Sequence, residues 1–170
     1  VRSLLPNIKI FASGDLDEWA IEDLKKNNAC IDGYGIGTKL VTGNSINGVY
    51  KLVEIDGIPT VKLSNSKKTL PGRKQIFRKQ INEKIVSDRL GLVEEKTLDS
   101  EQPLLQLVMK EGKKVQTPKS LEVIQERTFN SVASLSARTR DIDNPTSINV
   151  EISEALESLY QSLATNNKEE

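Results

Sequence analysis

The sequence has 170 residues and a mass of 18.9 kDa, the size of one domain or of one domain with a small addition. Its 24 basic and 24 acidic residues cancel, so there is no broad positive field that would favour nucleic acid as a partner. No apolar run approaches the roughly 20 residues of a membrane span. The start of the chain shows no signal-peptide cleavage pattern. The single cysteine, Cys30, excludes an internal disulfide and favours a cytoplasmic location.

The sequence contains no histidine. This absence excludes the commonest general base, most zinc sites and every triad built on a histidine. Any chemistry of this chain must therefore rest on other side chains or on backbone groups.

The first predicted unit is a strand, a loop and a helix. The apolar run at residues 8–12 predicts a buried strand that ends at Ser13-Gly14-Asp15. Apolar residues at helical spacing over 16–24 predict a helix, and Asp15 and Glu18 have the spacing of a capping box at its start. Trp19 lies on the apolar stripe and is expected in the core.

A second strand is expected at residues 29–31, in which Cys30 packs as a small hydrophobic side chain. It leads into a glycine-rich loop that ends at Gly37-Thr38. Two strand-loop-helix units in tandem predict a parallel βαβ arrangement. Because closure of a barrel takes about eight strands, two such units leave bare edges, and we expect the chain to be part of a longer one.

After this region the pattern becomes mostly antiparallel β. Residues 49–55 and 58–64 predict a hairpin that turns at Asp56-Gly57. Further strands are expected at 74–78, 85–93 and 104–109. Six basic residues in this stretch either contact an anionic substrate or protect a strand edge. They are Lys67, Lys68, Arg73, Lys74, Arg78 and Lys79.

Helical periodicity returns near the C-terminus. One helix is expected from Ser120, and a clearer one from Ser153 with Tyr160 on its core face, followed by a polar tail at 165–170. Glu94 and Glu95 are interpreted as solvated charges. We thus predict an α/β fold in three parts, at 1–47, 48–119 and 120–170.

Two loops are candidates for phosphate binding. At Ser13-Gly14-Asp15, free backbone N–H groups favour an anion, although Asp15 as an ordinary helix cap explains the same pattern. Gly35, Gly37 and Thr38 allow a nest of donors around an anion, although a tight turn is the simpler explanation. Since both loops follow the carboxyl ends of parallel strands, they are expected side by side.

Four motifs together resemble the nicotinate phosphoribosyltransferase family, because they occur in its order and at its separations. The resemblance covers nearly the whole chain and the C-terminal portion of the family's length. The motifs are Ile-Phe-Ala-Ser-Gly-Asp-Leu-Asp-Glu at 10–18, Ile-Asp-Gly-Tyr-Gly-Ile-Gly-Thr at 31–38, Gly-Val-Tyr-Lys-Leu-Val at 48–53 and Lys-Lys-Thr-Leu-Pro-Gly-Arg-Lys-Gln at 67–75.

The resemblance implies a fold and a reaction. The fold is the end of an incomplete, TIM-like α/β barrel of the type II phosphoribosyltransferase kind, followed by a β-rich segment and C-terminal helices. The reaction joins nicotinate to 5-phosphoribosyl 1-pyrophosphate, giving nicotinate mononucleotide and pyrophosphate in NAD biosynthesis. By resemblance, Asp15 binds the ribose hydroxyls and Ser13 and Gly14 shape its loop, while Gly35, Gly37 and Thr38 hold the 5-phosphate.

The family also couples the reaction to ATP, with Mg²⁺, through a phosphorylated histidine, and binds nicotinate with arginines earlier in its chain. Because this sequence contains neither, we expect a missing N-terminal part and no activity of the 170 residues alone. The resemblance suggests a homodimer, while the composition and the short apolar runs predict no nucleic-acid or membrane partner. Alternatives are the related nicotinamide phosphoribosyltransferase, a non-catalytic phosphate-binding remnant, and a purely structural role.

Overall fold

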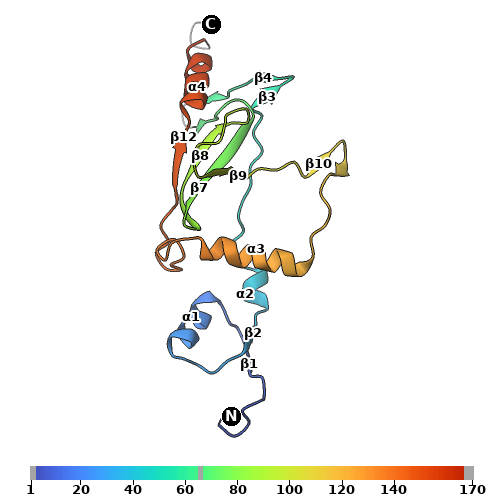
Figure 1. Ribbon diagram of the computed structural model, residues 1–170, viewed down its shortest axis with the longest axis vertical. Helices are drawn as coiled ribbons and strands as arrows, with labels where there is room; N and C mark the ends of the chain where they lie inside the picture. Colours follow the sequence, from blue (N-terminus) through green and yellow to red (C-terminus); the bar gives the residue numbers. More distant parts are fainter. Residues whose placement is uncertain (1–2, 65–66, 167–170) are drawn as a thin grey trace. The chain divides into compact units, whose positions relative to one another are not determined.

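The computed structural model describes residues 3–64 and 67–166 (Figure 1). The chain divides into two compact units, Val1–Val49 and Tyr50–Glu170. Within the described ranges, no helix has both the length and the apolar character that a membrane crossing requires. The division into three parts stays a prediction.

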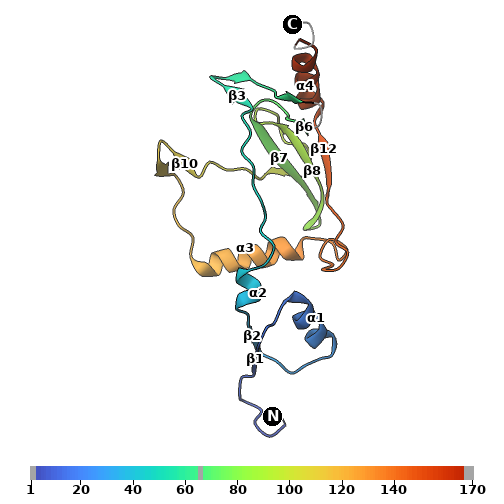
Figure 2. The same ribbon diagram turned by 180° about the vertical axis from the view of Figure 1, so that it is seen from behind.

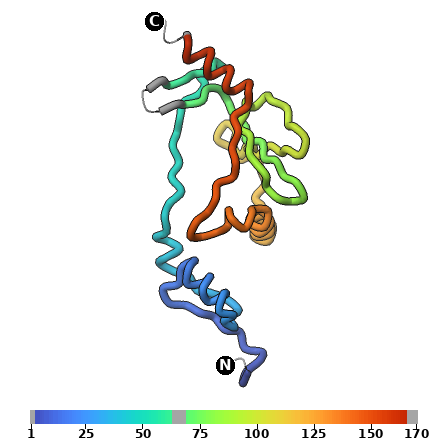
Figure 3. Tube along the Cα trace, turned by 90° about the vertical axis from the view of Figure 1, so that its left-hand side faces the viewer, coloured from blue at the N-terminus to red at the C-terminus, as the bar shows by residue number. Residues whose placement is uncertain are grey.

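The first unit contains two short parallel strands joined through a helix. Strand β1 (Phe11–Ser13) leads to helix α1 (Glu18–Lys26), and strand β2 (Gly33–Gly35) leads to the short helix α2 (Thr38–Val41). Figure 3 follows this unit in blue, from β1 around α1 and back to β2. The strands pair in parallel, so the predicted strand-helix-strand order is confirmed.

The second strand forms later in the chain than predicted. The N–H groups of Asp32 and Gly33 both donate to the carbonyl of Ile10, at 2.8 and 3.3 Å, and these bonds start the pairing. The Ala29 N–H instead donates to Leu24 O and closes the end of α1. Gly33 faces the ring of Phe11 so closely that a Cβ there would collide with it. Strand β2 (Gly33–Gly35) therefore lies within the glycine-rich segment that the sequence predicted to be a loop.

Three side chains of this unit are more exposed than predicted. Trp19 is 50% exposed and Phe11 is 71% exposed, so neither lies in a core, and Cys30 is also exposed. The physical reason is the small size of the sheet: two three-residue strands offer α1 little apolar surface to cover.

The second unit is built on a four-stranded sheet in the order β12-β8-β7-β9. Its strands are β7 (Lys74–Ile81), β8 (Lys84–Leu92), β9 (Glu101–Pro103) and β12 (Asn149–Ile152). Strand β7 pairs antiparallel with β8 and β9, whereas β12 pairs parallel with β8. The β7–β8 hairpin confirms the strands expected near 74–78 and 85–93, but no pattern predicted β12.

Short two-stranded hairpins lie in the chain before β7 and after β9 (Figure 2). They are β3 (Glu54–Ile55) with β4 (Ile58–Pro59), β5 (Leu63–Ser64) with β6 (Lys67–Lys68), and β10 (Met109–Lys110) with β11 (Lys113–Lys114). Asp56 and Gly57 have φ of 49° and 79°, which confirms the predicted tight turn. The strand expected at 104–109 is wrong, because only its last residue is in a strand.

Two helices complete the unit, α3 (Leu121–Ala133) and α4 (Glu154–Asn166), and both were predicted. The core gathers where α4 meets the sheet: Phe77 is 2% exposed, Leu156 is fully buried and Tyr160 is 7% exposed. Leu156 and Tyr160 are four residues apart, so they share one face of α4. Residues 167–170 of the predicted polar tail lie outside the described residues.

Candidate functional site

The parallel strands of the first unit bring the two candidate loops together. Ser13 lies directly opposite Gly35 at the carboxyl ends of β1 and β2. The chain therefore leaves adjacent strand ends as Gly14-Asp15 and as Ile36-Gly37. All of these positions are exposed, so the loops are accessible to a ligand.

The first loop has a backbone that local sequence explains only in part. Gly14 has a φ of 111°, a conformation that glycine adopts without strain, and Asp15 has a φ of 53°. The cap of α1 is Asp17, whose Oδ1 accepts from the Ala20 N–H at 2.9 Å, so the predicted capping role of Asp15 is wrong. The Asp15 carboxylate has no partner among the described residues, which leaves it available.

The second loop ends in α2. Gly37 is the N-cap of this helix, and its carbonyl accepts from the Leu40 N–H at 3.0 Å without any side-chain cap. The Thr38 hydroxyl has no hydrogen-bond partner within the described part of the chain. Lys39 Nζ lies 3.8 Å from Asp17 Oδ2, and this ion pair joins the second loop to the start of α1.

Two of the basic residues singled out in the sequence stabilise the second unit. Lys74 Nζ donates to the carbonyls of Leu70 and Gly72, both at 2.7 Å, and burial lowers the pKa of this ammonium group. Arg78 binds Asp88 in a two-pronged ion pair, at 2.9 Å from Nε and 2.8 Å from Nη2. The side chains of Lys67 and Lys68 lie outside the described residues.

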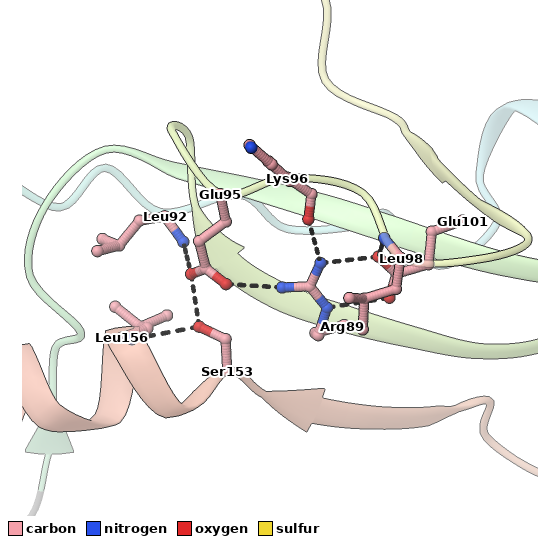
Figure 4. Close-up of polar contacts among 8 residues, drawn as sticks. All are labelled: Arg89, Leu92, Glu95, Lys96, Leu98, Glu101, Ser153 and Leu156. Carbon is pink, nitrogen blue, oxygen red and sulfur yellow. Dashed lines mark hydrogen bonds and ion pairs between the residues drawn. The ribbon is translucent and has the colours of Figure 1, made fainter.

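Sequence reasoning missed a cluster centred on Arg89 (Figure 4). Its guanidinium binds both oxygens of Glu101, at 2.9 and 2.7 Å, and Glu95 Oε2 at 2.7 Å. It also lies over the ring of Phe77, 4.3 Å from the ring centre. The bond to Arg89 lowers the pKa of Glu101 below its ordinary value.

Glu95 extends this cluster to helix α4. Its Oε1 accepts from the Leu92 N–H and from the Ser153 hydroxyl, both at 2.6 Å. The same Ser153 oxygen accepts from the Leu156 N–H at 3.2 Å and so caps the helix (Figure 4). Glu95 is therefore not a solvated charge. No local pattern shows this, because two of its three partners, Arg89 and Ser153, are 6 and 58 residues away in the sequence.

The comparisons with known proteins point to one family. Residues 95–160 match the model named nicotinate phosphoribosyltransferase C-terminal domain. Nicotinate phosphoribosyltransferase pncB2 of Mycobacterium tuberculosis is 39% identical over 114 residues, which are 65% of this chain and 24% of the relative. The nicotinate phosphoribosyltransferase of Homo sapiens is 31% identical over 186 residues, 94% of this chain and 35% of the relative.

A solved structure agrees with the sequence relatives. The crystal structure of human nicotinic acid phosphoribosyltransferase matches with a TM-score of 0.73 and 27% identity, over 95% of this chain and 34% of that chain. The chain thus has the mixed α/β fold of this family and spans about a third of the length of its human relative. The chain is therefore homologous to the C-terminal portion of the nicotinate phosphoribosyltransferases.

Proposed function

We propose that this chain supplies the ribose-5-phosphate part of a nicotinate phosphoribosyltransferase active site. The observation that carries the proposal is the pairing of Ser13 with Gly35, which sets two open loops at neighbouring strand ends. Strands β1 and β2 with α1 would then be the last units of an incomplete α/β barrel. The reaction is the formation of nicotinate mononucleotide and pyrophosphate, in NAD biosynthesis.

Each loop has a separate role in this proposal. The Asp15 carboxylate accepts hydrogen bonds from the ribose hydroxyls. It is available for them because Asp17, and not Asp15, caps the helix. The backbone at Gly35 and Gly37, with the Thr38 hydroxyl, donates to the 5-phosphate. A sugar that moves toward an oxocarbenium-like state needs both ends anchored, so that binding energy holds the reacting carbon in place.

ATP coupling, Mg²⁺ and a homodimer enter this proposal only through the family resemblance. Among the residues that the structure describes, no group of three or more Cys, Asp or Glu side chains could hold a metal ion. No step proposed here uses a metal ion.

The ribose role of Asp15 is testable in an assembly that contains this chain and the N-terminal portion of a related nicotinate phosphoribosyltransferase. We expect Asp15→Asn to lower kcat/KM for 5-phosphoribosyl 1-pyrophosphate by at least about tenfold, or ~1.4 kcal/mol of transition-state stabilisation. The matched control is Glu18→Gln, which removes the same charge from an exposed carboxylate three residues away and leaves Asp17, the cap of α1 and the partner of Lys39, intact. Equal kinetics of the two variants would contradict the ribose role.

We also expect the purified 170 residues alone to form no nicotinate mononucleotide from nicotinate, 5-phosphoribosyl 1-pyrophosphate and ATP. The reason is chemical, since the sequence contains no histidine to carry the phosphoryl group. The measurement is product formation by chromatography, with a complete relative as the positive control. Turnover by the chain alone would refute two expectations: that the reaction needs a histidine from the N-terminal part, and that this chain supplies only the ribose-5-phosphate part of the active site.

A further inference from the structure

One cavity is lined only by residues of the second unit. It is open to solvent, has a volume of about 570 Å³ and is lined by the β7–β8 hairpin, β9 with Leu104, and the C-terminal half of α3. In Figures 1 and 2 alike, the C-terminal end of α3 lies beside the end of this hairpin. The Ile85 N–H donates to Ser134 O at 3.0 Å and joins the hairpin to the end of the helix. Cavities of this size accept small organic ligands.

The lining contains three cations and one carboxylate. The cations are Arg78, Lys84 and Arg127, and the carboxylate belongs to Glu83. The chain as a whole has no net charge, so this excess of positive charge is local.

Two of the cations are held in place by bonds that leave donors over. Arg78 uses Nε and Nη2 for Asp88, and its Nη1 keeps two further N–H groups. Lys84 Nζ donates to Ala133 O at 2.6 Å, which offsets the negative end of α3 and leaves two of its three protons. The guanidinium of Arg127 has no partner in the described ranges, so all five of its N–H groups are available.

The lining also contains amide side chains, which add further hydrogen-bond donors. Gln102 Nε2 donates to Gln80 Oε1 at 3.0 Å, and this bond fixes the two amides side by side on β9 and β7. Asn130 lies three residues after Arg127, so both fall on the face of α3 that lines the cavity. Planar guanidinium groups with neighbouring amides are the donors that suit carboxylate and phosphate oxygens.

We propose that this cavity binds a small oxyanion, a phosphate or carboxylate group of a small molecule, with Arg127 as its main charged contact. The site goes beyond the proposed function, because none of its residues belongs to the loops of the first unit. Lys84 and Arg78 supply further donors from positions that the Ala133 carbonyl and Asp88 fix.

The test uses the full 170-residue chain, titrated separately with inorganic phosphate and with malonate and followed by NMR. We expect the side-chain amide signals of Gln80, Gln102 and Asn130 to shift with a saturable dependence on at least one probe. Saturation by phosphate alone identifies a phosphate site, and saturation by malonate alone identifies a carboxylate site. No saturable shift of these three amides with either probe would overturn the proposal.

Matched variants separate this site from general charge effects. Arg127→Gln should weaken binding by at least about tenfold, while Arg138→Gln, the same change at an exposed arginine outside the cavity, should leave it unaltered. Equal affinities of these two variants would also overturn the proposal. Phosphate that binds the first unit would instead shift the backbone amide signals of Gly35 and Gly37. The two sets of signals therefore report separately on the cavity and on the loops of the proposed function.

Discussion

At the scale of single residues, the clearest result concerns carboxylates that look alike in the sequence. Asp15 and Asp17 are two residues apart, but Asp17 caps α1 and Asp15 remains open. Glu94 is exposed, whereas its neighbour Glu95 binds Arg89, Leu92 and Ser153. Sequence alone could not separate the members of either pair, because the bonds depend on which way the backbone turns each side chain.

Loss of the Arg89 side chain should strongly destabilise the second unit. Its side chain is 14% exposed and that of Glu101 is 5% exposed, so Arg89→Met leaves a buried carboxylate without its cation. We expect a loss of about 3 kcal/mol in the free energy of unfolding. Urea unfolding followed by the amide signals of β7 and β8 measures it. The control is Arg138→Met, the same change at an exposed arginine. If Arg89→Met had as small an effect as this control, the cluster around Arg89 would not be stabilising.

The same cluster predicts a dependence on pH. Because Arg89 lowers the pKa of Glu101, its contribution to stability is complete above the ordinary glutamate pKa of about 4.3 and is lost as the pH falls through the lower, folded-state pKa. We expect Glu101→Gln to be less stable than the parent at pH 6 and to lose less stability toward pH 3. Urea unfolding at several pH values measures both slopes, and parallel slopes would contradict the assignment.

At the scale of elements, α3 and α4 show that local sequence decides whether a helix forms, whereas tertiary contacts decide whether it is buried. Both have 13 residues and both start after a serine whose hydroxyl accepts a backbone N–H. Yet α3 has no buried residue, while α4 buries Leu156 and Tyr160. The local pattern predicted both helices, but only the position of β8 and of Glu95 decides that α4 is packed.

The two capping serines form a natural pair for an experiment. Ser153 caps α4 and also donates to the half-buried Glu95 at 2.6 Å, whereas Ser120 accepts from Val123 N at 3.5 Å and its other partner is the exposed carboxylate of Glu122, two residues on. We therefore expect Ser153→Ala to cost about 2 kcal/mol and Ser120→Ala about 0.5 kcal/mol. Thermal unfolding of both variants measures the difference. A larger effect at Ser120 would contradict the bridging role of Ser153.

At the scale of the whole molecule, the segment that matches the family model is not a complete folding unit. It begins at residue 95, but β12 within it pairs only with β8, and Glu95 and Glu101 bind Arg89 of β8. Strand β8 ends at Leu92. The boundary of the sequence match therefore cuts through a sheet whose central strands lie before it.

This placement predicts how pieces of the chain behave. We expect residues 95–160 alone to be unfolded and residues 50–170 to fold, because only the longer piece contains the β7–β8 hairpin between β9 and β12. Dispersion of amide signals in NMR spectra distinguishes the two states. A well-dispersed spectrum for the shorter piece would show that its sheet forms without the hairpin.

The sequence by itself determined the local features and the family. The parallel strand-helix-strand unit, the Asp56-Gly57 turn, the strands β7 and β8 and the two long helices follow from periodicity and turn chemistry, which act over a few residues. Tertiary structure alone decided the rest: the late start of β2, the exposure of Trp19, the pairing of β12 and the cluster around Arg89. These depend largely on contacts between segments 12 to 62 residues apart, as between Arg89 and Glu101 or β8 and β12, and no local pattern encodes such contacts.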